Sequence, residues 1–292
     1  MRRLLVVLSL LLAHIANAGS ERCVDDDRNV KVCLDAPAAR IIALSPGATE
    51  LLYAAGAGDK LIAAVSFSDH PDEAKALPRV GSYNRFDLEA ILSLTPDLLI
   101  GWHSGNPTEQ LAQLEALGLK VYYSELRGFD DVSRTLRRFG ELAGSEPAAN
   151  AAAEHFDQGI SALRKQYQNA ESVRVFQQIW VNPLMTVNDQ HLISEATRLC
   201  GGINVFGNLP RLAARIDHEA VLAANPEAII AGGMGEENRS WLDDWRPYSG
   251  LLAVQRDNLF FIPPSTLQRP TPRLLSGTRM LCQHLDTARG RR

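Results

Sequence analysis

The stretch Arg40–Glu50, with the sequence RIIALSPGATE, has the form of a buried strand that runs directly into a helix. Its apolar run at 41–44 is short, and Ser-Pro-Gly follows at once, residues that begin turns and helices rather than continue strands. The helical pattern then extends through Leu51–Tyr53. This strand-helix unit is the building block of an α/β sheet, and the rest of the chain repeats it.

Similar apolar runs occur in both halves of the chain, each followed by a helical pattern. They lie at 61–65, 97–102 and 120–123 in the first half and at 174–179, 227–230 and 258–263 in the second. Strands that alternate with helices at this spacing imply a mostly parallel sheet. Because the pattern restarts near residue 174, we predict an α/β protein of two Rossmann-like lobes with mostly parallel sheets.

The segment between the two halves predicts a single long α-helix that joins the lobes. From Pro147 to Gln168 the chain is rich in Ala, Glu, Gln, Lys and Arg, with Gly159 as its one glycine. Ser145 is placed to cap the helix, with Pro147 in the first turn. At 1.5 Å per residue the helix extends about 30 Å. That length favours a brace, which would limit closure of the lobes, over one more crossover helix.

Two segments repeat one pattern, DLEAILSLTPD at 87–97 and DHEAVLAANPE at 217–227. The leading aspartate of each segment is placed to cap a short helix that the later proline ends. Glu89 and Glu219 lie in the first turn, where the helix dipole favours anions. Two copies of a common helix-strand unit explain the aspartates and prolines. They explain the matching glutamates less well, so we predict two related lobes that each present one acidic side chain.

Residues 1–18 have the order of a cleavable signal peptide. Two arginines precede an apolar run at 4–13, and Ala16-Asn17-Ala18 places small residues at the cleavage site. The run is too short to span a bilayer of about 30 Å, which favours cleavage over a retained membrane anchor. We therefore expect an exported protein. Its net charge of −4 argues against a nucleic-acid partner, which would need a basic face.

Four cysteines in an exported chain favour disulfides, and sequence alone allows three pairings. The segment 24–32 has the form of a hairpin with a polar tip at 25–29, which favours a bond between Cys23 and Cys33. That pairing leaves Cys200 and Cys282 for a second bond. A metal site is the alternative, and the lack of Cys-x-x-Cys spacing speaks against it.

These features divide the chain into five parts. We expect a signal peptide at 1–18, an N-terminal hairpin at 19–37, an N-terminal α/β lobe at 38–145, a linking helix at 146–170 and a C-terminal α/β lobe at 171–287.

The sequence lacks catalytic motifs. Gly-x-Ser-x-Gly, a P-loop and Gly-x-Gly-x-x-Gly do not occur, which leaves a serine hydrolase, an NTPase and a dinucleotide-binding enzyme without support. The histidines do not pair at the i, i+4 spacing of a helical metal site. His70 and His103 both follow strands and keep a metal or haem site open as an alternative. Because metal sites normally need three or four ligands, we expect no bound metal.

Large aromatic residues follow several of the predicted strands. Ligands of α/β sheets bind beyond the carboxyl ends of the strands, so these side chains are candidates for a ligand cleft. Core packing is the alternative for each one alone, but the set favours a cleft for a large, flat, partly apolar ligand. The candidate ligand-binding residues are Phe67, Tyr83, Trp102 and Trp180, with Arg269 as a hydrogen-bond donor to a polar ligand edge.

Several segments resemble a known family. Arg40–Glu50 resembles the opening of the substrate-binding proteins of cobalamin and siderophore ABC importers. Ser68–Pro71, Asp87–Glu89, Pro96–Trp102 and Cys200–Gly202 are similar to its cobalamin branch. The resemblance covers about residues 38–286 and implies two α/β lobes joined by one long helix, with no catalysis. It implies a periplasmic monomer that captures cobalamin, or a related corrinoid, for an inner-membrane ABC importer of permease and ATPase.

The resemblance also implies roles for single residues. Glu89 and Glu219 match lobe-tip glutamates that dock on arginines of the permease. The positions that match ligand contacts are Phe67, Tyr83, Trp102 and Arg269. Two positions depart from the family, because Ala213 stands for a cleft tryptophan and Ser265 for a contacting acid. A haem, metal-chelate or siderophore receptor of the same fold is one alternative, and an exported α/β enzyme is an alternative of another class.

Overall fold

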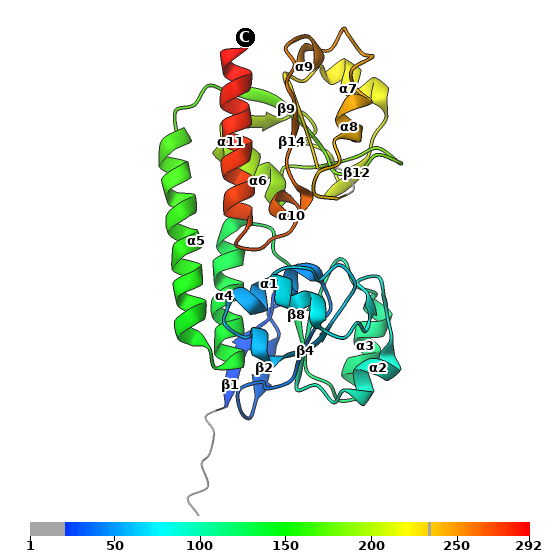
Figure 1. Ribbon diagram of the computed structural model, residues 1–292, viewed down its shortest axis with the longest axis vertical. Helices are drawn as coiled ribbons and strands as arrows, with labels where there is room; N and C mark the ends of the chain where they lie inside the picture. Colours follow the sequence, from blue (N-terminus) through cyan, green and yellow to red (C-terminus); the bar gives the residue numbers. More distant parts are fainter. Residues whose placement is uncertain (1–20, 233–234) are drawn as a thin grey trace, which may run out of the picture.

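The computed structural model describes residues 21–232 and 235–292, and the predicted signal peptide at 1–18 lies outside them. Two lobes lie one above the other along the long axis of the molecule, each built on a four-stranded parallel sheet (Figure 1). The predicted α/β fold class, two mostly parallel lobes joined by a long helix, is confirmed. In the part of the chain that is described, no helix combines the length and apolar character needed to cross a membrane.

The N-terminal lobe is built on the sheet β4-β3-β7-β8. Its strands are β3 (Ile41–Ala43), β4 (Leu61–Ala64), β7 (Leu98–Trp102) and β8 (Val121–Ser124), with a small antiparallel pair, β5 (Gly81–Ser82) and β6 (Arg85–Phe86). Its helices are α1 (Pro46–Ala54), α2 (Leu88–Ser93), α3 (Thr108–Ala116) and α4 (Phe129–Ala143), with 3-10 turns η1 (Gly58–Lys60) and η2 (Asp72–Ala76). Ser45 starts α1 because its hydroxyl accepts a hydrogen bond from the Ala48 amide at 3.1 Å.

The C-terminal lobe repeats this topology in the sheet β11-β9-β13-β14, also entirely parallel. Its strands are β9 (Val173–Gln178), β11 (Gly202–Asn204), β13 (Ala228–Ala231) and β14 (Leu259–Phe261), with an antiparallel pair, β10 (Met185–Val187) and β12 (Ala213–Arg215). Its helices are α6 (Leu192–Leu199), α7 (His218–Ala224), α8 (Ser240–Asp243), α9 (Leu252–Gln255), α10 (Pro264–Leu267) and α11 (Leu274–Gly290). In both sheets the strand that comes first in the chain lies between the second and the third.

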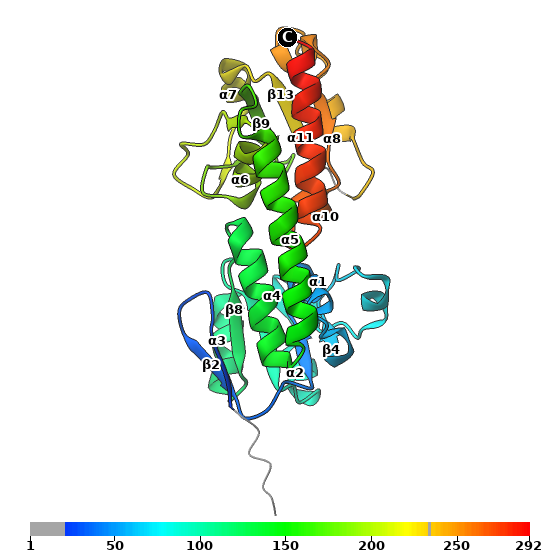
Figure 2. The ribbon, with the colours of Figure 1, turned by 90° about the vertical axis from the view of Figure 1, so that its left-hand side faces the viewer.

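Long helices run along one side of both lobes. The linking helix α5 (Glu146–Tyr167) passes from one lobe to the other, with α4 and α11 packed against it (Figure 2). The packing is close, because a Cβ atom on Gly140 of α4 would collide with Ala149 of α5. Gly159 of α5 lies equally close to Leu275 of α11. These glycines let the three helices form one layer.

The prediction for the start of α5 is confirmed only in part. Ser145 occupies the N-cap position and Pro147 lies in the first turn, but the Ser145 hydroxyl does not cap the helix. The hydroxyl donates instead to the carbonyl oxygen of Ala55, at 2.7 Å, at the end of α1. Ser145 therefore ties the start of the linking helix α5 to the end of α1 in the N-terminal lobe.

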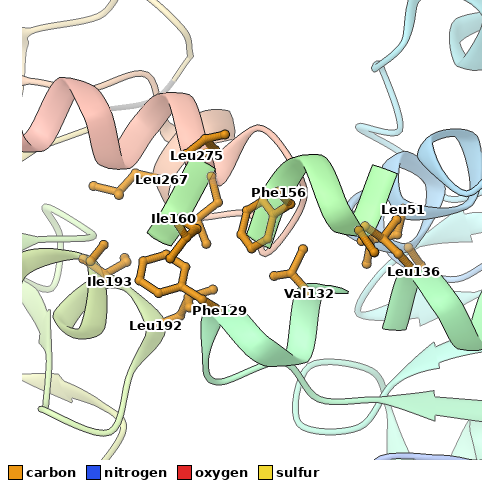
Figure 3. Packing of buried hydrophobic residues seen from close by; sticks show 14 of the residues in the cluster. Leu51, Phe129, Val132, Leu136, Phe156, Ile160, Leu192, Ile193, Leu267 and Leu275 are labelled. Atoms are coloured by element: carbon orange, nitrogen blue, oxygen red, sulfur yellow. The ribbon is translucent and has the colours of Figure 1, made fainter. Parts of the chain in front are cut away.

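One hydrophobic cluster, the shared core, extends through both lobes, and helices from both meet at their junction (Figure 3). The labelled residues where the helices of the two lobes meet include Phe129, Phe156, Ile160, Leu192, Ile193, Leu267 and Leu275. Two further clusters belong to one lobe each. Moving the lobes apart would expose the shared core to water, at a cost of roughly 25 cal/mol for each Å² of apolar surface.

Both predicted disulfides are present. Cys23 and Cys33 join the antiparallel strands β1 (Arg22–Asp25) and β2 (Lys31–Leu34) of an N-terminal hairpin. Cys200, at the end of α6, is bonded to Cys282 of α11. The second bond fixes α6 to the helical layer, and α6 also contributes to the junction between the lobes.

Candidate functional site

A cleft of about 560 Å³ lies between the lobes, at the carboxyl ends of both sheets. In each sheet the order reverses between the first and third strands, which is where α/β sheets bind ligands. The third strand of the N-terminal lobe ends at Trp102, and Trp180 follows the first strand of the C-terminal lobe. The structure brings all five predicted ligand-binding residues to this cleft: Phe67, Tyr83, Trp102, Trp180 and Arg269.

Phe67 stands out into the cleft on a strained backbone. Its φ is +65°, a left-handed conformation that is unusual for a bulky residue. The neighbouring Ser68 is buried and accepts a hydrogen bond from the Thr49 hydroxyl at 2.9 Å, which holds the turn in place. The Phe67 side chain remains 70% exposed. Backbone strain of this kind occurs at ligand sites, where the surrounding structure holds it.

Asn106 holds two of the aromatic loops together. Its side-chain amide donates to the carbonyl oxygens of Leu44 at 2.9 Å and Tyr83 at 2.7 Å, and its amide oxygen accepts from the Trp102 N–H at 2.6 Å. The rings of Tyr83 and Trp102 lie 6.1 Å apart between centroids. Trp102 also covers Gly105 so closely that any side chain there would collide with its ring. This buried asparagine therefore positions both aromatic residues before a ligand arrives.

Trp180 supplies the aromatic surface of the opposite lobe. Its indole N–H donates to the Asn182 carbonyl oxygen at 3.0 Å, and its ring meets that of Trp241 edge-on at 5.8 Å. The side chain is 41% exposed, although the residue lines the cleft. Ala213, where the family resemblance placed a tryptophan, is exposed on β12 and does not line the cleft.

Arg269 is fixed by an ion network that spans the two lobes. Its guanidinium group donates to Glu50 at 2.7 Å, to Asp69 at 2.8 Å and to the carbonyl oxygen of Phe67 at 3.3 Å. These bonds occupy three of its five N–H donors and leave two for a ligand. Burial acts to raise the pKa of Asp69, but the hydrogen bond and charge of Arg269 outweigh it and lower that pKa.

Glu50 and Arg273 complete the network and were not predicted from the sequence. Arg273 donates to both carboxylate oxygens of Glu50, at 3.0 and 2.7 Å, and to the Ser265 hydroxyl at 3.1 Å. Ser265 in turn donates to Glu236 at 2.6 Å. The one available signal was an ionisable residue, Glu50, in the middle of the apolar helix α1. Its partners follow it by more than 200 residues and could not be assigned.

The other end of the cleft is lined by Glu125, Arg127 and His191. Glu125 accepts hydrogen bonds from the amide and hydroxyl groups of Ser104, at 3.0 and 3.1 Å. Asp27, at the tip of the disulfide-bonded hairpin, accepts from the Glu125 amide at 2.7 Å. Burial raises the pKa of Asp27, while its hydrogen bond with the Glu125 amide acts to lower it. The hairpin therefore supports this wall.

Glu89 and Glu219 lie outside the cleft. Each is exposed in the first turn of a short helix, and the side chains of Asp87 and Asp217 cap these helices at 3.0 and 2.8 Å. The two helices, α2 and α7, occupy corresponding places in the two lobes (Figure 1). His103 also lies outside the cleft lining, with its ring against Tyr123.

A family model described as periplasmic binding protein matches residues 41–266. The chain belongs to the periplasmic binding protein family. Its curated relatives include the vitamin B12-binding protein of Vibrio cholerae, which is 36% identical over 252 residues, 86% of this chain and 91% of the relative. The vitamin B12-binding protein of Yersinia pestis is 35% identical over 248 residues, 85% of this chain and 86% of the relative.

Solved structures show the same relationship. The periplasmic vitamin B12 binding protein BtuF of Vibrio cholerae matches with a TM-score of 0.81 and 35% identity, over 87% of this chain and 98% of that protein. The periplasmic heme-binding protein RhuT from Roseiflexus sp. RS-1 matches with a TM-score of 0.76 and 22% identity, over 85% and 98%. The second likeness shows a shared fold. All these relatives are named as binding proteins rather than enzymes.

Proposed function

We propose that this protein is a periplasmic receptor that captures cobalamin (vitamin B12), or a related corrinoid, and delivers it to an inner-membrane ABC importer. The observation that carries the proposal is the cleft, around which four large aromatic side chains from both lobes stand exposed. A corrin ring is large, flat and partly apolar, so stacking on these rings would remove apolar surface from water. Identities of 36% and 35% with vitamin B12-binding proteins support this ligand.

The cleft residues contribute two kinds of contact to the ligand, aromatic surface and hydrogen-bond donors. Tyr83, Trp102 and Phe67 present aromatic surface from the N-terminal lobe, and Trp180 presents it from the C-terminal lobe. Trp180 thereby supplies the aromatic contact that Ala213 cannot. The two free N–H donors of Arg269 bind carbonyl oxygens on the amide groups of the corrin edge. Binding and release are the whole of the activity, without a chemical step or a catalytic cofactor.

Delivery requires a second surface, which we place at the tips of the lobes. Glu89 and Glu219 are exposed and lie on matching helices, as a partner that grips both lobes at once would need. Arginines of the permease are the chemical complement of such carboxylates. In this proposal the signal peptide at 1–18 directs the chain to the periplasm. There the mature monomer of hairpin, two lobes and linking helix meets the permease of an inner-membrane importer, which the ATPase of that importer drives.

Calorimetric titration with cyanocobalamin tests the proposed ligand. We expect one site per chain and a dissociation constant of about 1 μM or tighter. Absence of heat at micromolar concentrations would refute cobalamin as the ligand. Haemin and a ferric siderophore, titrated in the same way, test the other receptors of this fold. Their binding in place of cyanocobalamin would replace the proposed ligand.

A further inference from the structure

His191 lines the cleft and has no role yet in the proposed binding of cobalamin. It precedes α6 and caps that helix through its ring, because the amide N–H of Ile193 donates to its Nδ1 atom at 3.1 Å. A ring nitrogen that accepts a hydrogen bond must carry a lone pair rather than a proton. In the neutral imidazole the proton therefore resides on the other nitrogen, Nε2.

The surroundings of His191 keep the ring neutral. Burial lowers the pKa of His191 to about 4, the Glu125 carboxylate acts to raise it, and Arg127 acts to lower it further. Nε2 has no hydrogen-bond partner among residues 21–232 and 235–292 and is not among their buried unsatisfied atoms. The free N–H is therefore left for a molecule in the cleft.

We propose that His191 is a specificity-determining residue, whose Nε2–H group donates to an amide carbonyl oxygen on the rim of the ligand. The inference rests on the proposed function and deepens it. Because Nδ1 accepts the capping hydrogen bond, the proton resides on Nε2. Nε2 is then a hydrogen-bond donor and has no lone pair with which to bind a metal ion. His191 therefore favours a macrocycle with an amide rim and does not coordinate the iron of haem or a chelated metal.

Two substitutions distinguish the proposed Nε2–H hydrogen bond to the ligand from the cap that Nδ1 provides for α6. His191→Asn keeps a side-chain oxygen that caps the helix but is too short to reach the ligand. His191→Phe keeps the ring and loses both hydrogen bonds. We expect both variants to weaken cyanocobalamin binding about three- to tenfold, as loss of one hydrogen bond predicts. The control His155→Asn, at an exposed position of α5, should bind as the wild type does.

Nitrogen-15 NMR of the imidazole tests the tautomer without a ligand. We expect Nε2 protonated and Nδ1 unprotonated, with shifts that stay constant from pH 8 to about pH 5 because the pKa is about 4. A proton on Nδ1, or a charged ring at pH 7, would overturn the inference.

The binding outcomes also separate the two proposals. If the wild type binds cyanocobalamin and His191→Asn binds equally well, the role of His191 is wrong and the proposed function stands. If the wild type does not bind cyanocobalamin, the proposed function is wrong and the role of His191 falls with it. Binding of haemin with an iron–imidazole spectrum that His191→Asn abolishes would also overturn the inference.

Discussion

At Glu50 the structure buries a carboxylate almost completely, with 2% of the side chain exposed, and sets it against two arginines of the other lobe. A buried carboxylate is tolerated because Arg269 and Arg273 supply charge and hydrogen bonds. The same bonds hold Arg269 at the wall of the cleft. Glu50 thus acts as a positioning residue for the proposed ligand contact and as a link between the lobes.

Removal of this carboxylate should be costly. We expect Glu50→Ala to lower the free energy of unfolding by about 3–5 kcal/mol, because it leaves two guanidinium groups without a buried partner. Asp69→Asn is the matched control: it removes another carboxylate bound to Arg269, but one that is 53% exposed, and should cost less than about 1 kcal/mol. Urea denaturation followed by circular dichroism measures both. Equal losses for the two variants would show that burial of Glu50 carries no special cost.

Single residues were predictable from the sequence where local chemistry decides their place. The aromatic side chains after strands could be assigned to the cleft because parallel strands share one carboxyl end. Asn106 and Arg273 could not, because their partners lie on other segments of the chain. His191 resembled any loop histidine until its bond to the Ile193 amide fixed its tautomer.

Helices α2 and α7 give the two lobes matching surfaces. In both helices an aspartate caps the amino end and a glutamate follows in the first turn, as the repeated sequence predicted. The caps satisfy backbone N–H groups locally, and the next glutamate remains exposed. Sequence was sufficient here because a cap and its helix lie within a few residues.

The proposed docking role of these helices can be separated from ligand binding. We expect Glu89→Lys together with Glu219→Lys to leave cyanocobalamin affinity unchanged and to stop uptake, because charge reversal would repel arginines of the permease. Uptake of labelled cyanocobalamin by cells that depend on this receptor measures the effect. Glu154→Lys, an exposed site on α5, is the control and should transport normally. Full transport by the double variant would refute the docking role.

For the linking helix, the sequence predicted the position but not the tertiary contacts. Its position followed from composition, and the structure places it at Glu146–Tyr167. The hydrogen bond of Ser145 could not be predicted, because its hydroxyl donates to a carbonyl oxygen at the end of α1, far away in the sequence. The close packing of α4, α5 and α11 could not be predicted either. It depends on which side chains of the neighbouring helices face the glycines, and the sequence does not show this. Tertiary contacts overrode the local signals at both points.

The whole molecule is held in one arrangement by contacts on several sides of the cleft. The shared core packs the helices of both lobes together, and Glu50 binds arginines across the junction. On another side, Glu195 of α6 accepts a hydrogen bond from the Phe129 amide at the start of α4, at 2.9 Å. Closure of the lobes on a ligand would have to break these contacts together. The cleft is therefore already formed before the ligand binds.

Small-angle X-ray scattering of the protein with and without saturating cyanocobalamin tests whether the cleft is formed in advance. We expect superimposable profiles and an unchanged radius of gyration, because the shared core and the ion network resist movement of the lobes. A marked compaction on binding would contradict it, since it would show that the lobes close over the ligand.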